Sequence, residues 1–553
     1  MIKIKHYLVF VVLLFSVSIE AQITPVTHSM DPYNGPWTFN EASHLLRRTL
    51  YGPRYSQIAD AVNNGMDATV DDLLQVQMWS EPPLVYLPAD ALVGIGNTWV
   101  NSPFPVGNVN GAKSARGRSI RSWIMMNALN NDTTIAAKMD NFWHNHFAVT
   151  FPGDPRMSYQ YWELLRTHSL GNFKDLVKDI TVTPAMLKFL NGNRNHADAP
   201  NENYARELLE LFSIGRGEDL GNGDFSRYTE QDVVEGAKIL TGYKIQGASS
   251  TTVSTTSSVF DPSRHDNSVK TLSAYFDSAS IAPNGADEYK DHIDVIFSHP
   301  DFSDFICEKL YRYFVSSYVT AAVRDSIIPE MAATLTNNNF SIKAVMSQLL
   351  KSKHFYDVAL RGCLVKSPFD YMYSMFNATN AKLNNPDLVI NYSIGFKLFI
   401  HIEDLGMPIY PLPSVAGWPA YYLGPAYSRL WIDSESYKQR DDYLHNVVLD
   451  NGVSQSGVNF NISPINFIND LPNPSIADSV VEDMAKVLII DGNLSSTDLQ
   501  LIKDELLDGG TDADWTALYN NYLMDPTTYQ SQVGNKVKAA LGVVFSTYIF
   551  QTF

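Results

Sequence analysis

Amphipathic helical periodicity recurs along almost all of this 553-residue chain, and runs of strictly alternating apolar and polar residues are few. Apolar residues spaced three and four apart line one face of a helix, whereas a half-buried strand requires alternation. The pattern therefore predicts an all-α protein with little β structure. We expect helices at residues 40–51, 67–78, 117–130, 133–147, 158–169, 172–190, 203–214, 230–240, 288–297, 302–316, 321–337, 341–350, 367–377 and 535–550.

Three stretches lack this periodicity and interrupt the helices. Residues 247–258 are rich in Ser and Thr, which predicts a loop or a short exposed hairpin. Residues 406–433 are rich in Pro, Gly and aromatic residues, and 451–474 are also irregular. No flexible linker or internal repeat divides the chain. We therefore expect one large multi-helix domain at residues 37–553, with long irregular loops.

The first residues have the composition of a secretory signal peptide. Lys3 and Lys5 precede an apolar run at residues 7–17, and a cut after Ala21 follows a short stretch with small residues. The apolar run is about half the roughly 20 residues that a membrane helix needs. We expect a signal peptide at 1–21, a lead segment at 22–36, and a secreted or periplasmic protein with no integral membrane segment after signal removal. An uncleaved N-terminal anchor is the alternative.

The charge balance excludes several partners. The chain has 41 Lys and Arg against 59 Asp and Glu, a formal net charge of −18, and removal of two Lys and one Glu with residues 1–21 makes it −19. Nucleic acid and anionic membranes require clustered basic residues, so neither is an expected partner. No Gly-x-Ser-x-Gly elbow, phosphate loop or dinucleotide turn occurs, so no nucleotide cofactor is expected. A serine hydrolase remains open, because triads are recognised by geometry.

The two cysteines, Cys307 and Cys363, allow two arrangements. A disulfide between them would close a loop of about 56 residues and stabilise the fold by roughly 4 kcal/mol. Two separate buried thiols fit the helical periodicity around Cys307 equally well. Either arrangement excludes a metal site built only from thiolates.

Eight segments of the chain form a recognisable set. They are residues 44–49 (HLLRRT), 142–147 (FWHNHF), 201–211 (NENYARELLEL), 228–233 (YTEQDV), 240–243 (LTGY), 264–266 (RHD), 366–368 (KSP) and 415–419 (VAGWP). Together they resemble a large family of bacterial proteins called domain of unknown function 1800. The resemblance extends from about residue 37 to the C-terminus and implies a mainly helical, exported protein, but no settled activity. Tyr243 departs from the family pattern, where Trp is expected, and Asn267-Ser268 stands where a glycine-containing turn is usual.

The 201–211 segment places carboxylates beside an apolar helix face. That apolar face is predicted to consist of Tyr204, Leu208, Leu211 and Phe212. Asn203, Glu207 and Glu210 form the adjoining polar strip, which suits a cation or a cluster of sugar hydroxyls. Glu202 and Arg206 lie on the next strip. The alternative is a solvated, ion-paired helix start, in which Arg206 pairs with Glu202 or Glu210.

Histidines supply the second set of candidates. On a helix, His144 and His146 point about 200° apart and cannot bind one metal ion, whereas an extended segment would place them on one face. Either could be a general base or a metal ligand paired with a carboxylate of the 201–211 helix. The alternative for His146 is a buried, hydrogen-bonded core residue. His265 and Asp266 form a third candidate in a loop, with an Asx-turn and a surface histidine as the alternative.

These candidates combine into one hypothesis, a polar pocket with His and carboxylate groups. Its catalytic residues would be Glu207, Glu210, His146, His265 and Asp266. Substrate would contact Glu202, Asn203, Arg206, Trp418 and Tyr421, although Trp and Tyr beside Pro in the 417–422 loop could equally fill the core. A divalent metal ion, if one is bound, would take His144, His146, Glu207 and Glu210 as ligands.

The sequence thus predicts an exported carbohydrate-active hydrolase, resembling a glycoside hydrolase, with a polysaccharide or oligosaccharide as its partner. Glu207 and Glu210 are one helical turn apart, which suits a shared cation or one raised pKa better than two carboxylates on opposite faces of a sugar. The alternative is a non-catalytic factor for the cell envelope or for polysaccharide assembly or binding.

Overall fold

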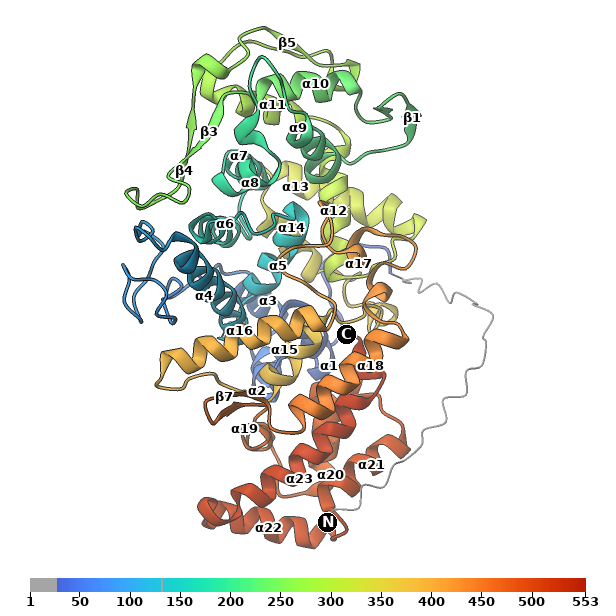
Figure 1. Ribbon diagram of the computed structural model, residues 1–553. Helices are drawn as coiled ribbons and strands as arrows, with labels where there is room; N and C mark the ends of the chain where they lie inside the picture. The colour runs from blue at the N-terminus through green and yellow to red at the C-terminus, as the bar shows by residue number, and fades with distance from the viewer. Residues whose placement is uncertain (1–26, 131–132) are drawn as a thin grey trace.

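The computed structural model describes residues 27–130 and 133–553, and helices dominate this part of the chain (Figure 1). It contains 23 α-helices and four two-stranded antiparallel ribbons. The predicted all-α class is therefore confirmed. The predicted signal peptide at 1–21 lies outside the described residues, as does the start of the lead segment at 22–36.

The chain builds the middle of the molecule first, then one end, then returns through the middle to the other end (Figure 1). The first helices are α1 (Phe39–Thr49), α2 (Tyr55–Asn64), α3 (Met66–Leu73), α4 (Val109–Asn130), α5 (Ala136–Phe147), α6 (Pro155–Thr167), α7 (Phe173–Thr181) and α8 (Pro184–Phe189). The upper end contains α9 (Asn203–Glu207), β1 (Asp219–Gly221), β2 (Asp224–Phe225), α10 (Glu230–Ile239), β3 (Tyr243–Gln246), β4 (Ser257–Phe260), β5 (Lys270–Thr271), β6 (Ser280–Ile281) and α11 (Glu288–Ile296).

The second half of the chain packs against these helices and forms the lower end. The returning helices are α12 (Asp301–Phe314), α13 (Ile328–Asn337), α14 (Ile342–Leu350), α15 (Pro368–Ala378), α16 (Leu388–Asp404), α17 (Pro419–Tyr422) and α18 (Ser434–Tyr443). The lower end contains β7 (Val453–Gln455), β8 (Val458–Phe460), α19 (Pro464–Asp470), α20 (Ala477–Leu488), α21 (Ser496–Leu507), α22 (Asp512–Met524) and α23 (Pro526–Ser546). Helix α16 lies along α4, and α23 packs on α21 and α22.

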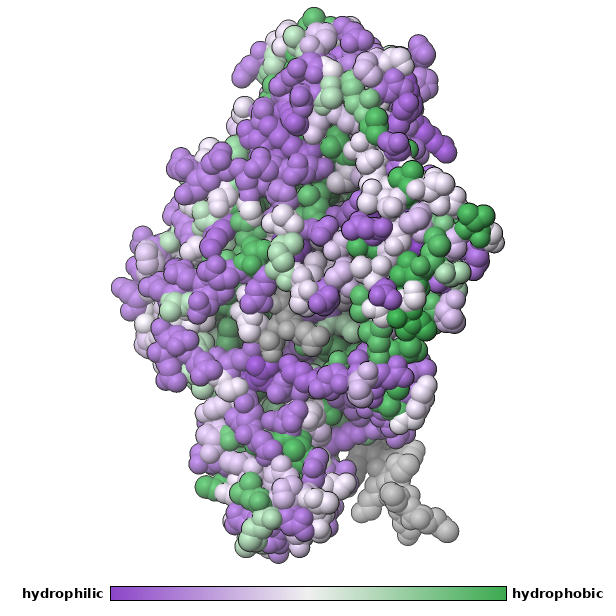
Figure 2. All heavy atoms as spheres, turned by 90° about the vertical axis from the view of Figure 1, so that its left-hand side faces the viewer, coloured by the Kyte–Doolittle hydropathy of each residue, from purple (hydrophilic) through white to green (hydrophobic). Residues whose placement is uncertain are grey.

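One hydrophobic core runs through the described residues, from Met30 near their start to Phe550 near their end. The surface of the molecule carries both hydrophilic and hydrophobic residues, and the face in Figure 2 is largely hydrophilic with smaller hydrophobic patches. Among the described residues, no helix combines the length and the apolar character needed to cross a membrane.

Local sequence explains where the helices differ from the prediction. The helix expected at 172–190 is divided into α7 and α8, because Pro184 occupies the first turn of a new helix that is capped by Thr183. Helix α16 was not predicted, since its residues are apolar over much of its circumference and show no clear stripe. Residues 247–256 are the loop that joins strands β3 and β4 into a hairpin, so most of the stretch predicted as a loop or short hairpin is loop.

Both cysteines are free thiols. Cys307 is buried, and burial raises the pKa of its thiol. The Cys363 sulfur is 3.1 Å from the carbonyl oxygen of Val315, to which it donates. The arrangement with two separate thiols is thus the correct alternative.

Candidate functional site

The helix that carries Glu207 and Glu210 changes its backbone hydrogen-bonding pattern after Glu207. Helix α9 continues into a π-helical turn at Leu208–Ser213, in which each turn holds an extra residue. The wider turn rotates the apolar face, so that Leu209 is buried and Leu211 is only partly buried. The predicted apolar face is therefore correct at Tyr204, Leu208 and Phe212, and wrong at Leu211.

Glu207 and Glu210 lie at this junction, and both side chains are partly buried. Burial raises the pKa of Glu207 to about 7, and the nearby Glu210 carboxyl adds to the rise. Glu210 accepts a hydrogen bond of 3.2 Å from the Tyr228 hydroxyl, and its other oxygen is 3.4 Å from Nε of Arg216. Tyr228 and Arg216 thus hold the Glu210 carboxyl, whereas the Glu207 carboxyl gains or loses a proton near neutral pH.

The neighbouring charges form an ion-pair network between α9 and α10. The Arg206 guanidinium is 3.1 Å from Glu202 and 2.8 Å from Glu230. Its hydrogen bonds lower the pKa of the Glu230 carboxyl. This arrangement matches the ion-paired alternative for Glu202 and Arg206, while Asn203 is exposed to solvent.

His146 is a core residue that binds the π-helical turn through its backbone. The ring Nε2 is 3.2 Å from the carbonyl oxygen of Phe212, and Nδ1 is 3.2 Å from Nζ of Lys309. Lys309 also donates to the carbonyl of Leu211 at 2.8 Å. Burial and the Lys309 ammonium hold the pKa of His146 well below the usual value for histidine. The alternative of a hydrogen-bonded core histidine is therefore the correct one.

His144 is buried on another side of α5. Its Nδ1 is 3.1 Å from the Tyr161 hydroxyl, and its Nε2 is 3.1 Å from the carbonyl oxygen of Ile409. Burial lowers the pKa of His144 to about 4, so the ring is neutral at physiological pH. Since both ring nitrogens of His144 and of His146 already have other partners, the predicted metal ligand set with Glu207 and Glu210 is not assembled. No group of three or more His, Cys, Asp or Glu suited to a metal ion occurs in residues 27–130 and 133–553.

The third candidate pair divides between the interior and the surface. His265 is buried, with Nδ1 3.0 Å from the carbonyl of Thr241 and Nε2 2.9 Å from Glu288. The other Glu288 oxygen is 2.6 Å from Nζ of Lys270, which is also buried. Asp266 instead accepts hydrogen bonds from Ser268 in an Asx-turn. The turn alternative is thus correct for Asp266, but its companion histidine is not at the surface.

The aromatic loop fills the core. Trp418 is 1% exposed, and its indole N–H donates to the carbonyl of Pro408 at 2.9 Å. Tyr421 packs on the rings of Tyr313 and Trp431, and burial raises the pKa of its hydroxyl. These contacts match the core-filling alternative, so Trp418 offers no face for stacking on a sugar.

The hydrogen-bond partners of the three histidines differ, and none of the three bonds to Glu207 or Glu210. The predicted common pocket of His and carboxylate groups is therefore not formed by direct contacts among the described residues. Of the five predicted catalytic residues, Glu207 and Glu210 are the two that remain as a neighbouring, partly accessible pair of acidic groups.

Comparison with known families agrees with the segments seen in the sequence. Residues 44–548 match the family described as a protein of unknown function, DUF1800. The chain belongs to this family. Neither the curated proteins nor the solved structures contain a match.

Six of the eight DUF1800 segments are joined in pairs by direct hydrogen bonds. The pairs are His146 with Phe212 directly after segment 201–211, Asn145 with Trp418, Glu210 with Tyr228, and Thr241 with His265. These bonds connect positions up to 273 residues apart in the chain. The DUF1800 segments thus hold distant parts of the fold together.

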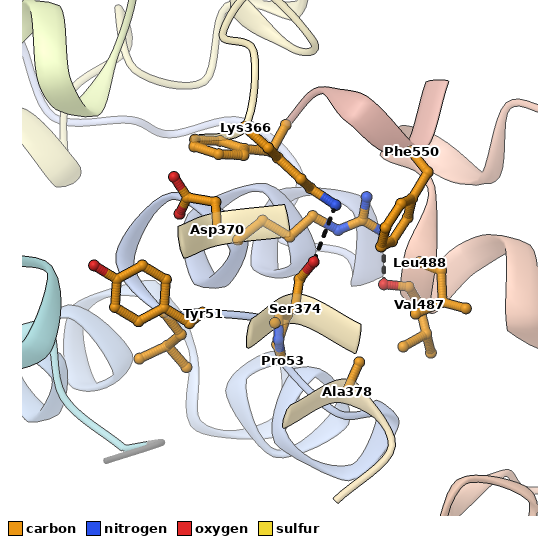
Figure 3. Close-up of a pocket in the computed structure, with 13 residues that line it drawn as sticks. Tyr51, Pro53, Lys366, Asp370, Ser374, Ala378, Val487, Leu488 and Phe550 are labelled. Carbon is orange, nitrogen blue, oxygen red and sulfur yellow. Dashed lines mark hydrogen bonds between the residues drawn. The ribbon is translucent and has the colours of Figure 1, made fainter. Parts of the chain in front are cut away.

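The two remaining DUF1800 segments, 44–49 and 366–368, meet at a cavity that sequence reasoning did not identify. Arg47 and Lys366 line it together with Asp370 (Figure 3). Sequence reasoning also missed Lys309, Glu288 and Lys270. The sequence signal that could have identified such residues is a charged residue among the apolar residues of a predicted helix, as at Arg47 and Arg48.

Proposed function

We propose that this DUF1800 protein is an exported hydrolase that acts on carbohydrate, with Glu207 as the proton donor. Glycoside hydrolysis commonly uses two carboxyl groups, one of which has a raised pKa and protonates the leaving oxygen. Glu207 suits that role, because its pKa of about 7 keeps much of the group protonated at neutral pH. Glu210 would supply the second carboxyl group.

The observation that carries the proposal is the Glu207–Glu210 pair at the start of the π-helical turn. π-Helical turns are rare in proteins, and many of those that occur lie at functional sites. The hydroxyl of Tyr228 and the guanidinium of Arg216 hold Glu210, which leaves Glu207 as the mobile proton carrier. Carbohydrate as the substrate class, and a polysaccharide or oligosaccharide as the partner, rest on the export signal and the acidic composition of the chain.

Replacement of the proton donor tests this proposal. Glu207→Gln should lower turnover of chromogenic polysaccharides at least about 100-fold, since a positioned general acid contributes that much or more. The parent rate should fall as the pH rises above about 7, when Glu207 loses its proton. The matched control is Glu482→Gln, because the Glu482 side chain is 65% exposed on α20 and belongs to none of the candidate sets; its rate should stay within a few fold of the parent. An unchanged rate in Glu207→Gln would refute the role of Glu207.

The second candidate is a non-catalytic factor for the cell envelope or for polysaccharide assembly. It is favoured by the residues around the pair, because Arg206 is already bound to Glu202 and Glu230 and Trp418 is buried. Glycan-array binding by the parent and by Glu207→Gln separates the two functions. Equal binding by both proteins, without turnover of any array glycan, would favour the binding factor.

A further inference from the structure

A groove of about 570 Å³ lies between the turn at residues 274–279 and the corner where α11 leads into α12. Residues 295–301 form that corner, and Ser226, directly after β2, also lines the groove. Binding sites for small molecules commonly measure about 300–1,000 Å³. The groove is therefore large enough for a ligand, and neither Glu207 nor Glu210 lines it.

Aromatic and apolar side chains form part of this groove. Tyr275 is 39% exposed, whereas the neighbouring Phe276 is buried. The Phe276 ring packs against the ring of His299, with 5.4 Å between their centroids. Burial lowers the pKa of His299, so its ring is neutral at physiological pH. An exposed tyrosine ring in such a lining can stack on the C–H face of a sugar ring.

Two carboxylates line the same groove, and both have oxygen atoms that are available to a ligand. Asp301 contacts Nε of Arg227 at 3.3 Å and Nδ1 of His299 at 3.8 Å, in each case through Oδ2, which leaves Oδ1 for a ligand. The exposed side chain of Asp277 has no hydrogen-bond or ion-pair partner among the described residues. Hydrogen bonds from hydroxyl groups to such charged acceptors are roughly twice as strong as neutral ones.

The charges of the groove narrow the class of ligand. Among the described residues, no Lys or Arg side chain lines it. Two carboxylates without a lining cation disfavour phosphates, sulfates and acidic sugars, because like charges repel. A small hydrated cation would make no use of the aromatic and apolar lining. Carboxylate acceptors beside an exposed aromatic ring instead suit a neutral compound that is rich in hydroxyl groups.

The groove and the acidic pair of the proposed hydrolase are connected by one chain segment. Ser226 lines the groove, and Tyr228 donates to Glu210 at 3.2 Å. Because these two residues are two positions apart, their Cα atoms are separated by at most about 7 Å. Arg227, between them, contacts a carboxylate of the groove and donates to the carbonyl of Ile214 at 2.6 Å, directly after the π-helical turn. The groove thus adjoins the segment that holds Glu210.

We propose that this groove binds sugar units of a neutral oligosaccharide, with Tyr275 stacked on a sugar face and Asp277 and Asp301 accepting its hydroxyl groups. The bound units would belong to the chain that Glu207 cleaves, so this part of the inference rests on the proposed function. The groove would anchor the substrate while the acidic pair acts on a linkage nearby. Binding itself requires no turnover, since the acidic pair does not line the groove.

Isothermal titration calorimetry with the Glu207→Gln protein tests the groove, because this variant should not consume the probes. The probes are the neutral hexasaccharides of cellulose, laminarin, amylose and chitin. At least one of them should bind saturably, with about one molecule per chain and a Kd below about 1 mM. The proposal is overturned if none of them binds.

Substitutions in the groove should weaken that binding. Tyr275→Ala removes the stacking ring and should raise the Kd about tenfold. Asp277→Asn replaces a charged acceptor with a neutral one and should raise the Kd about fivefold. Asn is a suitable replacement, because it tolerates the φ of +53° at this position.

The matched control for the aromatic ring is Tyr318→Ala, because Tyr318 is 38% exposed and lies outside the groove. Its Kd should equal that of the Glu207→Gln protein. Tyr275→Phe retains a ring and should retain most of the affinity. Unchanged affinity in a folded Tyr275→Ala variant, or an equal loss in Tyr318→Ala, would overturn the proposal.

Two further comparisons separate this inference from its neighbours. The hexamer of glucosamine carries positive charges, and tighter binding of this probe than of every neutral hexasaccharide would overturn the assignment in favour of an amine site. Saturable binding without turnover by the parent would support the groove and refute the hydrolase. Turnover by the parent, without saturable binding to the Glu207→Gln protein, would overturn the groove and leave the hydrolase in place.

Discussion

At the scale of single residues, Gly417 shows how closely two distant segments approach each other. Its φ of +89° lies in the left-handed region, and a Cβ atom would be 2.5 Å from the carbonyl oxygen of Asn145 and closer still to its side-chain oxygen. The next residue, Trp418, donates its backbone N–H to that side-chain oxygen at 2.8 Å. Glycine at 417 is thus required both by the backbone conformation and by the space available.

We expect Gly417→Ala to lower the free energy of unfolding by about 2–4 kcal/mol, the sum of a left-handed backbone penalty and overpacking. Urea unfolding would measure it. Gly457→Ala is the matched control, since Gly457 has a φ of +79° but nothing within 4 Å of its Cβ position, and should cost only about 1 kcal/mol. An equal decrease in the free energy of unfolding of the two variants would show that the contact with Asn145 does not contribute to the cost.

At the scale of elements, helix α5 connects several parts of the molecule, because its buried polar side chains each bind a different element. Its Lys138 pairs with Asp370 of α15, and Asp140 pairs with Arg166 of α6. His144 binds the carbonyl of Ile409, and His146 binds that of Phe212. A helix this rich in buried polar groups is stable only because each group has a partner.

The Asp140–Arg166 pair gives the third prediction. Both side chains are at most 4% exposed, Nε of Arg166 is 2.9 Å from Asp140, and the guanidinium lies 3.5 Å from the centre of the Trp79 ring. Arg166→Met should cost about 3–5 kcal/mol, because it leaves Asp140 buried without a partner. Adding Asp140→Leu should recover much of that loss.

A double-mutant cycle, measured by urea unfolding, checks this coupling. The exposed Lys438–Asp442 pair of α18 serves as the control and should show no measurable coupling. A cycle for Asp140 and Arg166 that closes without an interaction energy would contradict the prediction.

Sequence periodicity predicted most of the helices, but not which residues their side chains contact. Periodicity located α5, and the 200° angle between His144 and His146 excluded a shared metal ion from a helical segment. It could not show that His146 meets a backbone carbonyl 66 residues away, because hydrogen-bond partners depend on tertiary packing. The π-helical turn after Glu207 was equally hidden, since an extra residue per turn leaves no mark in composition.

At the scale of the whole molecule, buried neutral histidines make stability depend on pH. Burial lowers the pKa of His144 and of His292 to about 4 each. An unfolded chain takes up these protons as the pH falls below about 6.5, whereas the folded chain does not until near 4. The folded state is therefore most stable above pH 6.5 with respect to these groups, and loses stability between pH 6.5 and 4.

Each of the two histidines should lower the free energy of unfolding by about 2 kcal/mol between pH 7 and pH 5. His292→Leu should remove its share of that loss, and should not destabilise at pH 7, because neither ring nitrogen has a partner in the described residues. Urea unfolding at both pH values gives the difference. His445→Leu changes a histidine whose side chain is 54% exposed, and should keep the parental pH dependence.

The helical class could be read from periodicity, since a helical stripe is a local property. The cavity between α1 and α15 could not. Its walls come from residues about 320 to 500 positions apart, and no local pattern reports that Arg47 faces Lys366 or Phe550. Charged residues in an apolar window indicate burial, but not what they face.

Arg47 also determines when the molecule can be completed. This residue of the first described helix donates to the carbonyls that end α20, and its nearest acceptor there is 439 residues further along the chain. At a synthesis rate of about 5–20 residues per second, roughly 20–90 s separate the appearance of the donor from that of its acceptors. Contacts this distant in sequence also slow folding, because a long loop must close before they form. The earliest helix is therefore among the last to reach its final surroundings, and a chain that stops before Val487 never closes the cation-lined cavity.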